Sequence, residues 1–283
     1  MKRLLLLEYY KNLNYKPFQI FSILYFLVLI ALLFIGLVDM EPVKGLKINL
    51  KQQGIYNFPE IWNFTTWIVA LLKIFLGLIL VFSICQEFTN RMFKQNTIDG
   101  LSRKEFVFSK LLTIFIFTIL STIIVFGITL ALGIAYSNTT ESQQITQEIF
   151  FIGNYFVKLF TFFSFLMFLS ILLRKSIFVF LFFFMYWIGE SILSGIESFL
   201  RIKNITAGPD QIKALTEEVL LTNLLPLNSM SSLISNPFSR LTIAKQMGFN
   251  YNFSYPTESL IACIIWCVIF VSGSYFILKK KDW

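Results

Sequence analysis

The sequence predicts an all-α integral membrane protein with six transmembrane helices, on the strength of three observations. Of its 283 residues, 56% are hydrophobic and only 14% are charged, more apolar surface than a soluble domain of this size can bury. The apolar residues gather into six long runs, each of roughly 19–26 residues, enough for a helix to cross about 30 Å of hydrocarbon. The runs are continuous rather than alternating, which is not the pattern of a membrane β-barrel.

The six runs can be taken in order along the chain. Pro17 opens the first run at a position that the first turn of a helix tolerates. We expect no cleavable signal peptide in the given sequence, because its first apolar stretch is short and Glu8 and Lys11 follow. The predicted spans are residues 18–38, 64–85, 111–136, 150–173, 177–200 and 260–278.

The distribution of Lys and Arg predicts that both termini are cytoplasmic. With this orientation most basic residues fall in cytoplasmic segments, whereas the outer loop at residues 137–149 has none. Membrane topology therefore accounts for the net charge of +8, and no nucleic-acid partner is expected. The largest outer loop, residues 201–259, contains four Pro residues and is expected to form short helices on, or dipping into, the outer face of the membrane region. A plain structured loop is the alternative.

Several kinds of chemistry are excluded by residue type. The chain has no His, which excludes His-dependent triads and His-ligated zinc sites. Cys85, Cys263 and Cys267 lie in or at the ends of apolar runs without a CxxC spacing, so we interpret them as small buried side chains. The Ser residues of the spans have no evident base partner. We therefore predict no catalytic residue and no metal site.

The polar segment at residues 86–110, between the second and third spans, is the most informative part of the chain. Residues 86–95 are expected to continue helically out of the second span, and residues 96–100, with Asp-Gly as a turn signal, to end this helix. Ser102 and Glu105 then match a capping box, which predicts a new helix start. Residues 86–110 should thus form a short basic elbow outside the membrane. An ordinary loop that follows the positive-inside rule is the alternative.

The polar residues of this elbow resemble the corresponding loop of bacterial ABC-transporter permeases of the type-2 exporter class. In that family a Glu near the end of the second span precedes a turn, and a basic residue and a Lys at the start of the third span follow it. Where the family often has Gly-Thr and Pro, this chain has Asn90-Arg91 and Leu101-Ser102, so it resembles a subgroup. The matching or neighbouring polar residues, which the resemblance implies are coupling residues, are Glu87, Arg91, Lys94, Asp99, Gly100, Ser102, Arg103, Glu105 and Lys110.

The resemblance implies a fold and a mechanism for the whole chain. Residues 1–283 would form one permease domain of a bacterial cytoplasmic (inner) membrane, with an amphipathic cytoplasmic helix in residues 1–17. Two permease copies, expected to be a homodimer, would be driven by a separate ABC ATPase subunit that binds ATP and Mg²⁺. Accessory extracytoplasmic proteins could join this complex. A separate subunit is needed because the chain has no G-x-x-x-x-G-K-[ST] loop. Alternatives from other classes are an ion-coupled secondary transporter and a non-transporting membrane scaffold.

Four charged residues fall inside predicted spans: Lys73, Lys158, Glu190 and Glu197. A lone charge at such a depth costs a few kcal/mol or more, so pairing is expected. Because the fourth and fifth spans are joined by a very short connection, we predict that Glu190 pairs with Lys158. Lys73 is expected to face the transport pathway or the dimer interface. The alternative is that these charges form purely structural ion pairs, or that the lysine side chains extend outward to the membrane surface.

Overall fold

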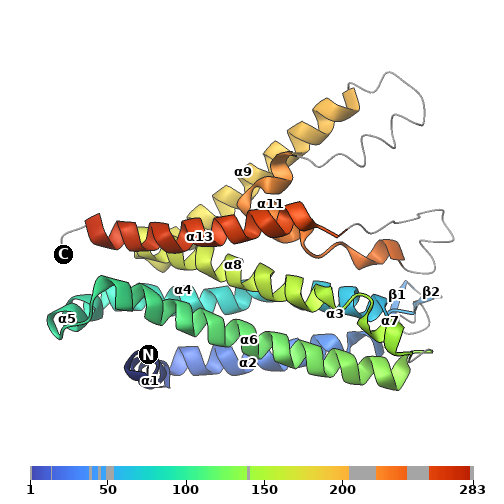
Figure 1. The fold of residues 1–283 in the computed structure, drawn as a ribbon, viewed down its shortest axis with the longest axis horizontal. Coiled ribbons are helices and arrows are strands. Elements are labelled where there is room, and N and C mark those ends of the chain that lie inside the picture. The colour runs from blue at the N-terminus through green and yellow to red at the C-terminus, as the bar shows by residue number, and fades with distance from the viewer. Residues whose placement is uncertain are drawn as a thin grey trace.

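Long helices lying side by side build the protein. The computed structural model describes residues 2–13, 15–37, 40–43, 46–48, 54–138, 141–203, 221–240 and 255–280. The long helices are α2 (Lys16–Leu33), α6 (Arg103–Tyr136), α8 (Phe150–Leu173), α9 (Ser176–Lys203) and α13 (Thr257–Lys280) (Figure 1). These five helices are long and apolar enough to cross a membrane, and a bent pair, α3 (Glu60–Ala70) with α4 (Lys73–Thr89), makes a sixth candidate span. The predicted count of six is therefore met only if the bent pair counts as one span.

Short elements connect the long helices. They are α1 (Lys2–Leu13), η1 (Ile35–Leu37), β1 (Met40–Val43), β2 (Leu46–Ile48), α5 (Met92–Ile98), α7 (Ser142–Thr146), η2 (Leu221–Leu224), α11 (Pro226–Ser232) and η3 (Pro237–Arg240). Strands β1 and β2 pair antiparallel, with Met40 opposite Ile48 and Val43 opposite Leu46. The sequence predicts only helices, so this small hairpin is an addition to an otherwise helical fold.

The second predicted span is broken rather than continuous. The α3 and α4 axes differ by 40° across Leu71 and Leu72, whose amides donate to carbonyls three residues back instead of four. Within α3, the hydroxyls of Thr65 and Thr66 donate to the carbonyls four residues earlier, at 2.7 and 2.6 Å. Such side-chain bonds commonly bend helices. The apolar run predicts the span's existence, but it carries no signal for this change in backbone bonding.

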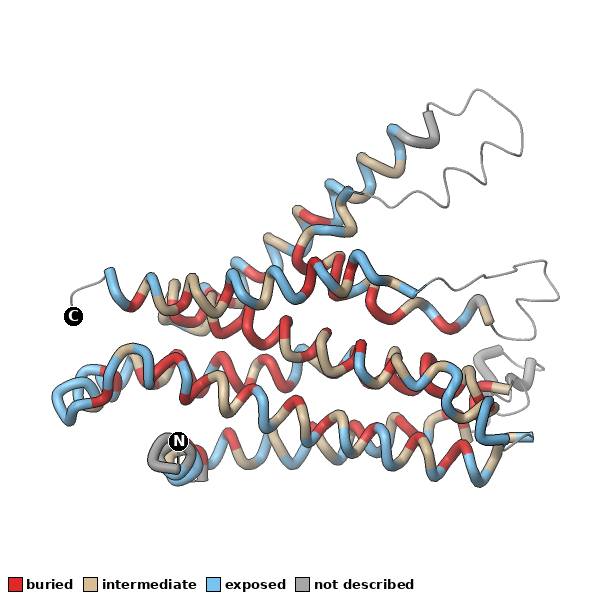
Figure 2. Tube along the Cα trace, in the orientation of Figure 1, coloured by how far each residue is buried: buried red, intermediate tan, exposed pale blue. Residues whose placement is uncertain are grey.

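Helix α8 forms the centre of the bundle. It is buried along most of its length and packs against α13, α4, α6 and α3 (Figure 2). The approach of α4 depends on Gly77, because a Cβ there would lie 2.4 Å from Cδ1 of Leu166. The outer helices α2 and α9 instead expose many large apolar side chains, as helices that face lipid do.

Short helices between α9 and α13 confirm part of the prediction for residues 201–259. Helix α9 leans away from the bundle, and α11 lies beside it against α13 (Figure 1). Helix α11 is largely buried and begins at Pro226, in the first-turn position that proline favours. It is thus inserted among the long helices. Residues 204–220 and 241–254 of the predicted loop lie outside the described residues.

One end of the bundle collects α1, α5 and the C-terminal end of α13 (Figure 1); we call it the α5 end. A hydrogen bond joins the end of α13 to the start of α6, because Nη1 of Arg103 donates to the carbonyl oxygen of Lys279 at 2.6 Å. A guanidinium at the last turn of a helix satisfies a carbonyl that the helix leaves unpaired and complements its dipole.

Candidate functional site

The elbow at the α5 end is built from two tight backbone reversals. Arg91, with φ of 57°, ends α4 and starts α5, so the predicted continuous helix over residues 86–95 is wrong. Helix α5 then ends as the Asp-Gly signal predicts, because Gly100 adopts φ of 91°. The amides of Gly100 and Leu101 donate to the carbonyls of Thr97 and Asn96, a Schellman arrangement that favours glycine at this position.

The predicted capping box starts the next helix. The hydroxyl of Ser102 accepts from the amide of Glu105 at 3.2 Å, and the Glu105 carboxylate accepts from the amide of Ser102 at 2.8 Å. These two bonds satisfy amides that the first turn of the 34-residue helix α6 leaves unpaired. The re-entry of the chain into the bundle is therefore fixed locally, as predicted.

The elbow has an apolar inner face and an exposed outer face. Inside, the rings of Phe88, Phe93 and Phe106 contact one another, with centroids 4.8–5.8 Å apart. Such an edge-on aromatic cluster holds α5 against the start of α6. Outside, Ile98 is 85% exposed, a large apolar side chain at the tip of the molecule with nothing covering it among the described residues.

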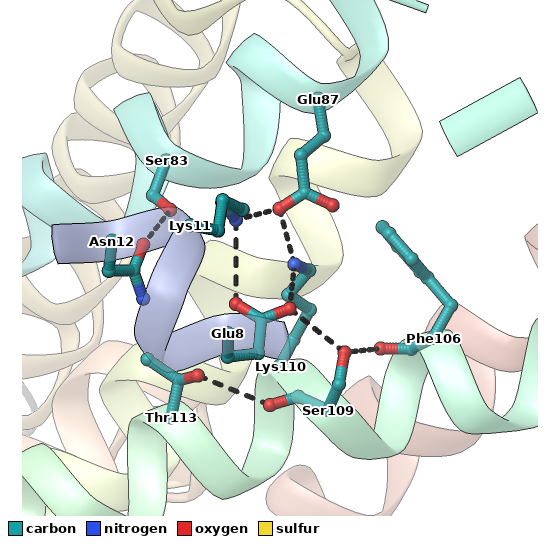
Figure 3. Close-up of polar contacts among 9 residues, drawn as sticks. All are labelled: Glu8, Lys11, Asn12, Ser83, Glu87, Phe106, Ser109, Lys110 and Thr113. Atoms are coloured by element: carbon teal, nitrogen blue, oxygen red, sulfur yellow. Dashed lines mark hydrogen bonds and ion pairs between the residues drawn. The ribbon is translucent and has the colours of Figure 1, made fainter. Parts of the chain in front are cut away.

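Four charged side chains form a buried ion cluster at the base of the elbow (Figure 3). Lys110 pairs with the carboxylates of both Glu8 and Glu87. Lys11 pairs with Glu87 and, at 3.4 Å, with Glu8. The residues come from α1, α4 and α6, and Ser109 adds a hydroxyl that donates to Glu8 at 3.1 Å. Two cations thus neutralise two carboxylates, which a cluster excluded from water requires.

The cluster determines how α1 is turned. Its polar side faces the bundle, and Asn12 there accepts from the Ser83 hydroxyl at 3.2 Å. Its other side exposes Leu6, Tyr9 and Tyr10. This is the reverse of a helix on a water-soluble protein, and it suits a helix whose outer side lies in the membrane interface.

The electrostatics of the cluster keep Glu8 ionised. Burial raises the pKa of the Glu8 carboxyl, but the ammonium groups of Lys110 and Lys11 outweigh it and lower this pKa to about 2. The sequence did not point to Glu8 or Lys11 as members of a site. Their only signal was the spacing of two opposite charges, one turn apart, in an otherwise apolar stretch.

The structure divides the predicted coupling residues into two groups. At the base, Glu87 and Lys110 are buried in the ion cluster, while Ser102 and Glu105 serve the helix cap. Arg103 is half-buried and bonded to the end of α13. The exposed group at the outer face consists of Arg91, Lys94, Asp99 and Gly100.

The predicted pair between Glu190 and Lys158 is wrong. The two oxygens of Glu190 accept from the amides of Leu227 and Asn228, at 3.1 and 2.9 Å, in the first turn of α11. Helix α11 contacts both α8 and α9, and the otherwise unpaired amides of its first turn donate to the carboxylate and carry the partial positive charge of the helix N-terminus. Two turns further along α9, Glu197 likewise accepts from Leu221 and Thr222 at the start of η2, at 2.8 and 2.9 Å.

Comparison with protein families agrees with this architecture. Two family models, both described as ABC-2 family transporter protein, match the chain, one over residues 100–283 and the other over residues 4–190. No curated protein matches it. Domains of this family are transmembrane rather than catalytic components, and membership implies partnership with an ABC ATPase subunit. Each match spans more than half of the chain, which therefore belongs to the ABC-2 transporter family and is a multi-pass membrane permease.

Proposed function

We propose that this chain is the membrane subunit of an ATP-driven exporter, and that a separate ATPase drives it through the outer face of the elbow. That face comprises Arg91, Met92, Lys94, Ile98 and Asp99, all exposed. A basic surface around one projecting apolar side chain is suited to a cleft with acidic walls and an apolar floor. ATP and Mg²⁺ would be held by the ATPase, below the α5 end.

The observation that carries this proposal is the contrast between the tip of the elbow and its base. The tip is exposed, with Ile98 the most exposed of its apolar side chains. At the base, Glu87 and Lys110 are 2% and 3% exposed and are paired with α1. A force applied to α5 would therefore reach both α4 and α6, the two helices that lead into the membrane.

The ion cluster makes the three helices at this end move together. Separating α1 from α4 and α6 would break the pair of Glu8 with Lys110 and the pair of Lys11 with Glu87. Breaking a buried ion pair typically costs about 3–5 kcal/mol. Sliding one helix past another would break the same pairs. We infer that α1, α4 and α6 respond to the ATPase as one lever rather than as three independent helices.

The proposal includes an orientation and a second copy. The α5 end would be cytoplasmic in a bacterial inner membrane, as the distribution of Lys and Arg indicates. Two copies would form the pathway as a homodimer, covering part of the exposed apolar faces of α2 and α9, with lipid covering the rest. An ion-coupled transporter would need an acidic group such as Glu190 within the membrane to carry the proton or ion, but both oxygens of Glu190 already accept from backbone amides.

The test uses the complex of this chain with its ATPase, reconstituted in lipid vesicles. Ile98→Glu combined with Lys94→Glu should lower ATPase binding by at least about tenfold, as for a central interface residue. Neither position contacts the ion cluster, so α1 should keep its protection from hydrogen exchange. Arg103 is less suitable, because its replacement would also break the bond to Lys279.

The matched control is Glu141→Lys, an exposed charge reversal on the connection at the opposite end of the bundle. It should leave ATPase binding and the dependence of ATP hydrolysis on this chain unchanged. Normal binding and coupled hydrolysis in the doubly substituted elbow would refute the proposed contact.

A further inference from the structure

Two lysines lie inside the bundle where α4 and α8 meet. Lys73 is the first residue of α4, directly after the break in the second span, and its Nζ lies 4.8 Å from the centroid of the Phe162 ring. Lys158 lies one helical turn before Phe162 on α8 and is only 6% exposed. Lys73 thus contacts a ring that lies one turn from Lys158 on the same face of α8, which brings two like charges into one region of the bundle.

Neither lysine has an acidic partner among the residues that the structure describes. No carboxylate there lies within 4.0 Å of either ammonium group, and Glu190, the partner predicted for Lys158 from the sequence, is bound to α11. The Lys158 ammonium also makes no hydrogen bond within the described part of the chain, although the Cys263 thiol is near. Two like charges at this depth are costly unless an anion joins them.

The surroundings of Lys73 indicate what kind of anion this is. Leu71, Ile74 and Phe75, next to it in sequence, are 57%, 40% and 57% exposed and face outward from the bundle. A ligand that reaches the lysines from this side must pass along apolar side chains within the membrane. An amphiphile with an anionic head group and an apolar tail meets both requirements, whereas a free anion would have to leave water to reach them.

We propose that Lys73 and Lys158 bind the phosphate of a membrane lipid that enters at the break between α3 and α4. Two ammonium groups offer up to six donors to the phosphate oxygens, and their charge offsets its negative charge. The aromatic ring of Phe162 already contacts the Lys73 ammonium and would leave its remaining donors to the phosphate. That this lipid is the exported substrate rests on the proposed function; the binding itself does not.

Binding is tested by native mass spectrometry of the purified chain in detergent. Dioleoyl phosphatidylglycerol should bind the unmodified chain, and the variant with Lys73→Met and Lys158→Met should lose about tenfold or more of this binding, as for lost charge-assisted hydrogen bonds. The control variant, with Lys104→Met and Lys280→Met, removes two exposed charges and should bind normally. Glycerol phosphate, which lacks the tails, should not compete at the same concentration. Equal binding by the two double variants would overturn the proposal, and so would full competition by glycerol phosphate.

The melting temperature, measured with and without lipid, distinguishes a lipid-binding pair of lysines from a purely structural pair. Without added lipid, the Lys73→Met and Lys158→Met variant should melt no lower than the unmodified chain, since it removes two charges that have no acidic partner among the described residues. Added phosphatidylglycerol should raise the melting temperature of the unmodified chain only. A lower melting temperature without lipid, together with no effect of lipid on either protein, would mean that the lysines are structural.

Transport is separated from binding by measuring ATP hydrolysis in the reconstituted complex. If phosphatidylglycerol stimulates hydrolysis and the lysine variant abolishes this stimulation, the bound lipid is the substrate or resembles it. If the elbow variant uncouples hydrolysis but the lysine variant binds lipid normally, the inference fails and the proposed function stands. If the lysine variant loses lipid binding while the elbow variant stays coupled, the proposed function fails and the lipid site stands.

Discussion

Replacement of Lys110 by Met should release α1 from the bundle. Lys110 is 3% exposed and is the cation shared by Glu8 and Glu87, so its loss leaves two buried carboxylates with only Lys11 between them. Breaking a buried pair by removing one partner typically costs about 3–5 kcal/mol. At about 1.4 kcal/mol per factor of ten, amide protection in α1 should fall by about a hundredfold or more.

Hydrogen exchange read by mass spectrometry is suited to this prediction, because α1 can open locally while the spans stay folded. Lys94→Met, an exposed lysine on α5, should change protection by less than about 0.5 kcal/mol. The double variant Glu87→Gln with Lys110→Met should regain much of the loss, since it leaves the neutral pair of Glu8 and Lys11. If Lys110→Met left α1 fully protected, or if the double variant were as unstable as the sum of the single variants, the account of the cluster would be wrong.

Three further predictions follow from the described contacts. The folded-state pKa of Glu8 is lowered from 4.5 to about 2, so ionised Glu8 stabilises the docking of α1 fully above pH 4.5, and this stabilisation is lost as the pH falls toward 2. Glu8→Gln should remove this component from the pH dependence of amide protection in α1. Glu190→Gln should weaken the start of α11 by about 1–2 kcal/mol, measured as exchange of its first amides, because one charged acceptor at a helix N-terminus is lost. Gly77→Ala should lower thermal stability by about 1–3 kcal/mol through its clash with Leu166, whereas Gly127→Ala, where a Cβ meets open space, should be neutral or slightly stabilising.

The parts of the fold that the sequence predicts well are those that depend on neighbouring residues. Six apolar runs identify the spans because hydrocarbon thickness sets their length, and the Ser102 and Glu105 capping box is a relation across three residues. Gly100 is a similar case, since its left-handed conformation is what a helix ending there requires. Arg91 adopts a left-handed conformation as well, yet its residue type does not favour one, so the break at α5 went unpredicted.

The site was harder to predict because its members are far apart in sequence. Glu8 and Lys110 are separated by 102 positions, and nothing in either local pattern indicates that they meet. The expected pair of Glu190 and Lys158 failed for a different reason. Residue depth can be counted along neighbouring helices, but the actual partners of Glu190 are backbone amides of α11, which no residue type reveals.

The ion cluster also constrains the order in which the chain can assemble. Helix α1 is synthesised before α6, yet Lys110, one of the two cations that pair with its Glu8, belongs to the start of the third span, about a hundred residues later. Until Lys110 has been synthesised and α6 has entered the bilayer, the polar side of α1 cannot be buried with its ion pairs complete, so it must stay in contact with water. Helix α1 is therefore made before the helix that its docking requires, and it can take its final place only after α6.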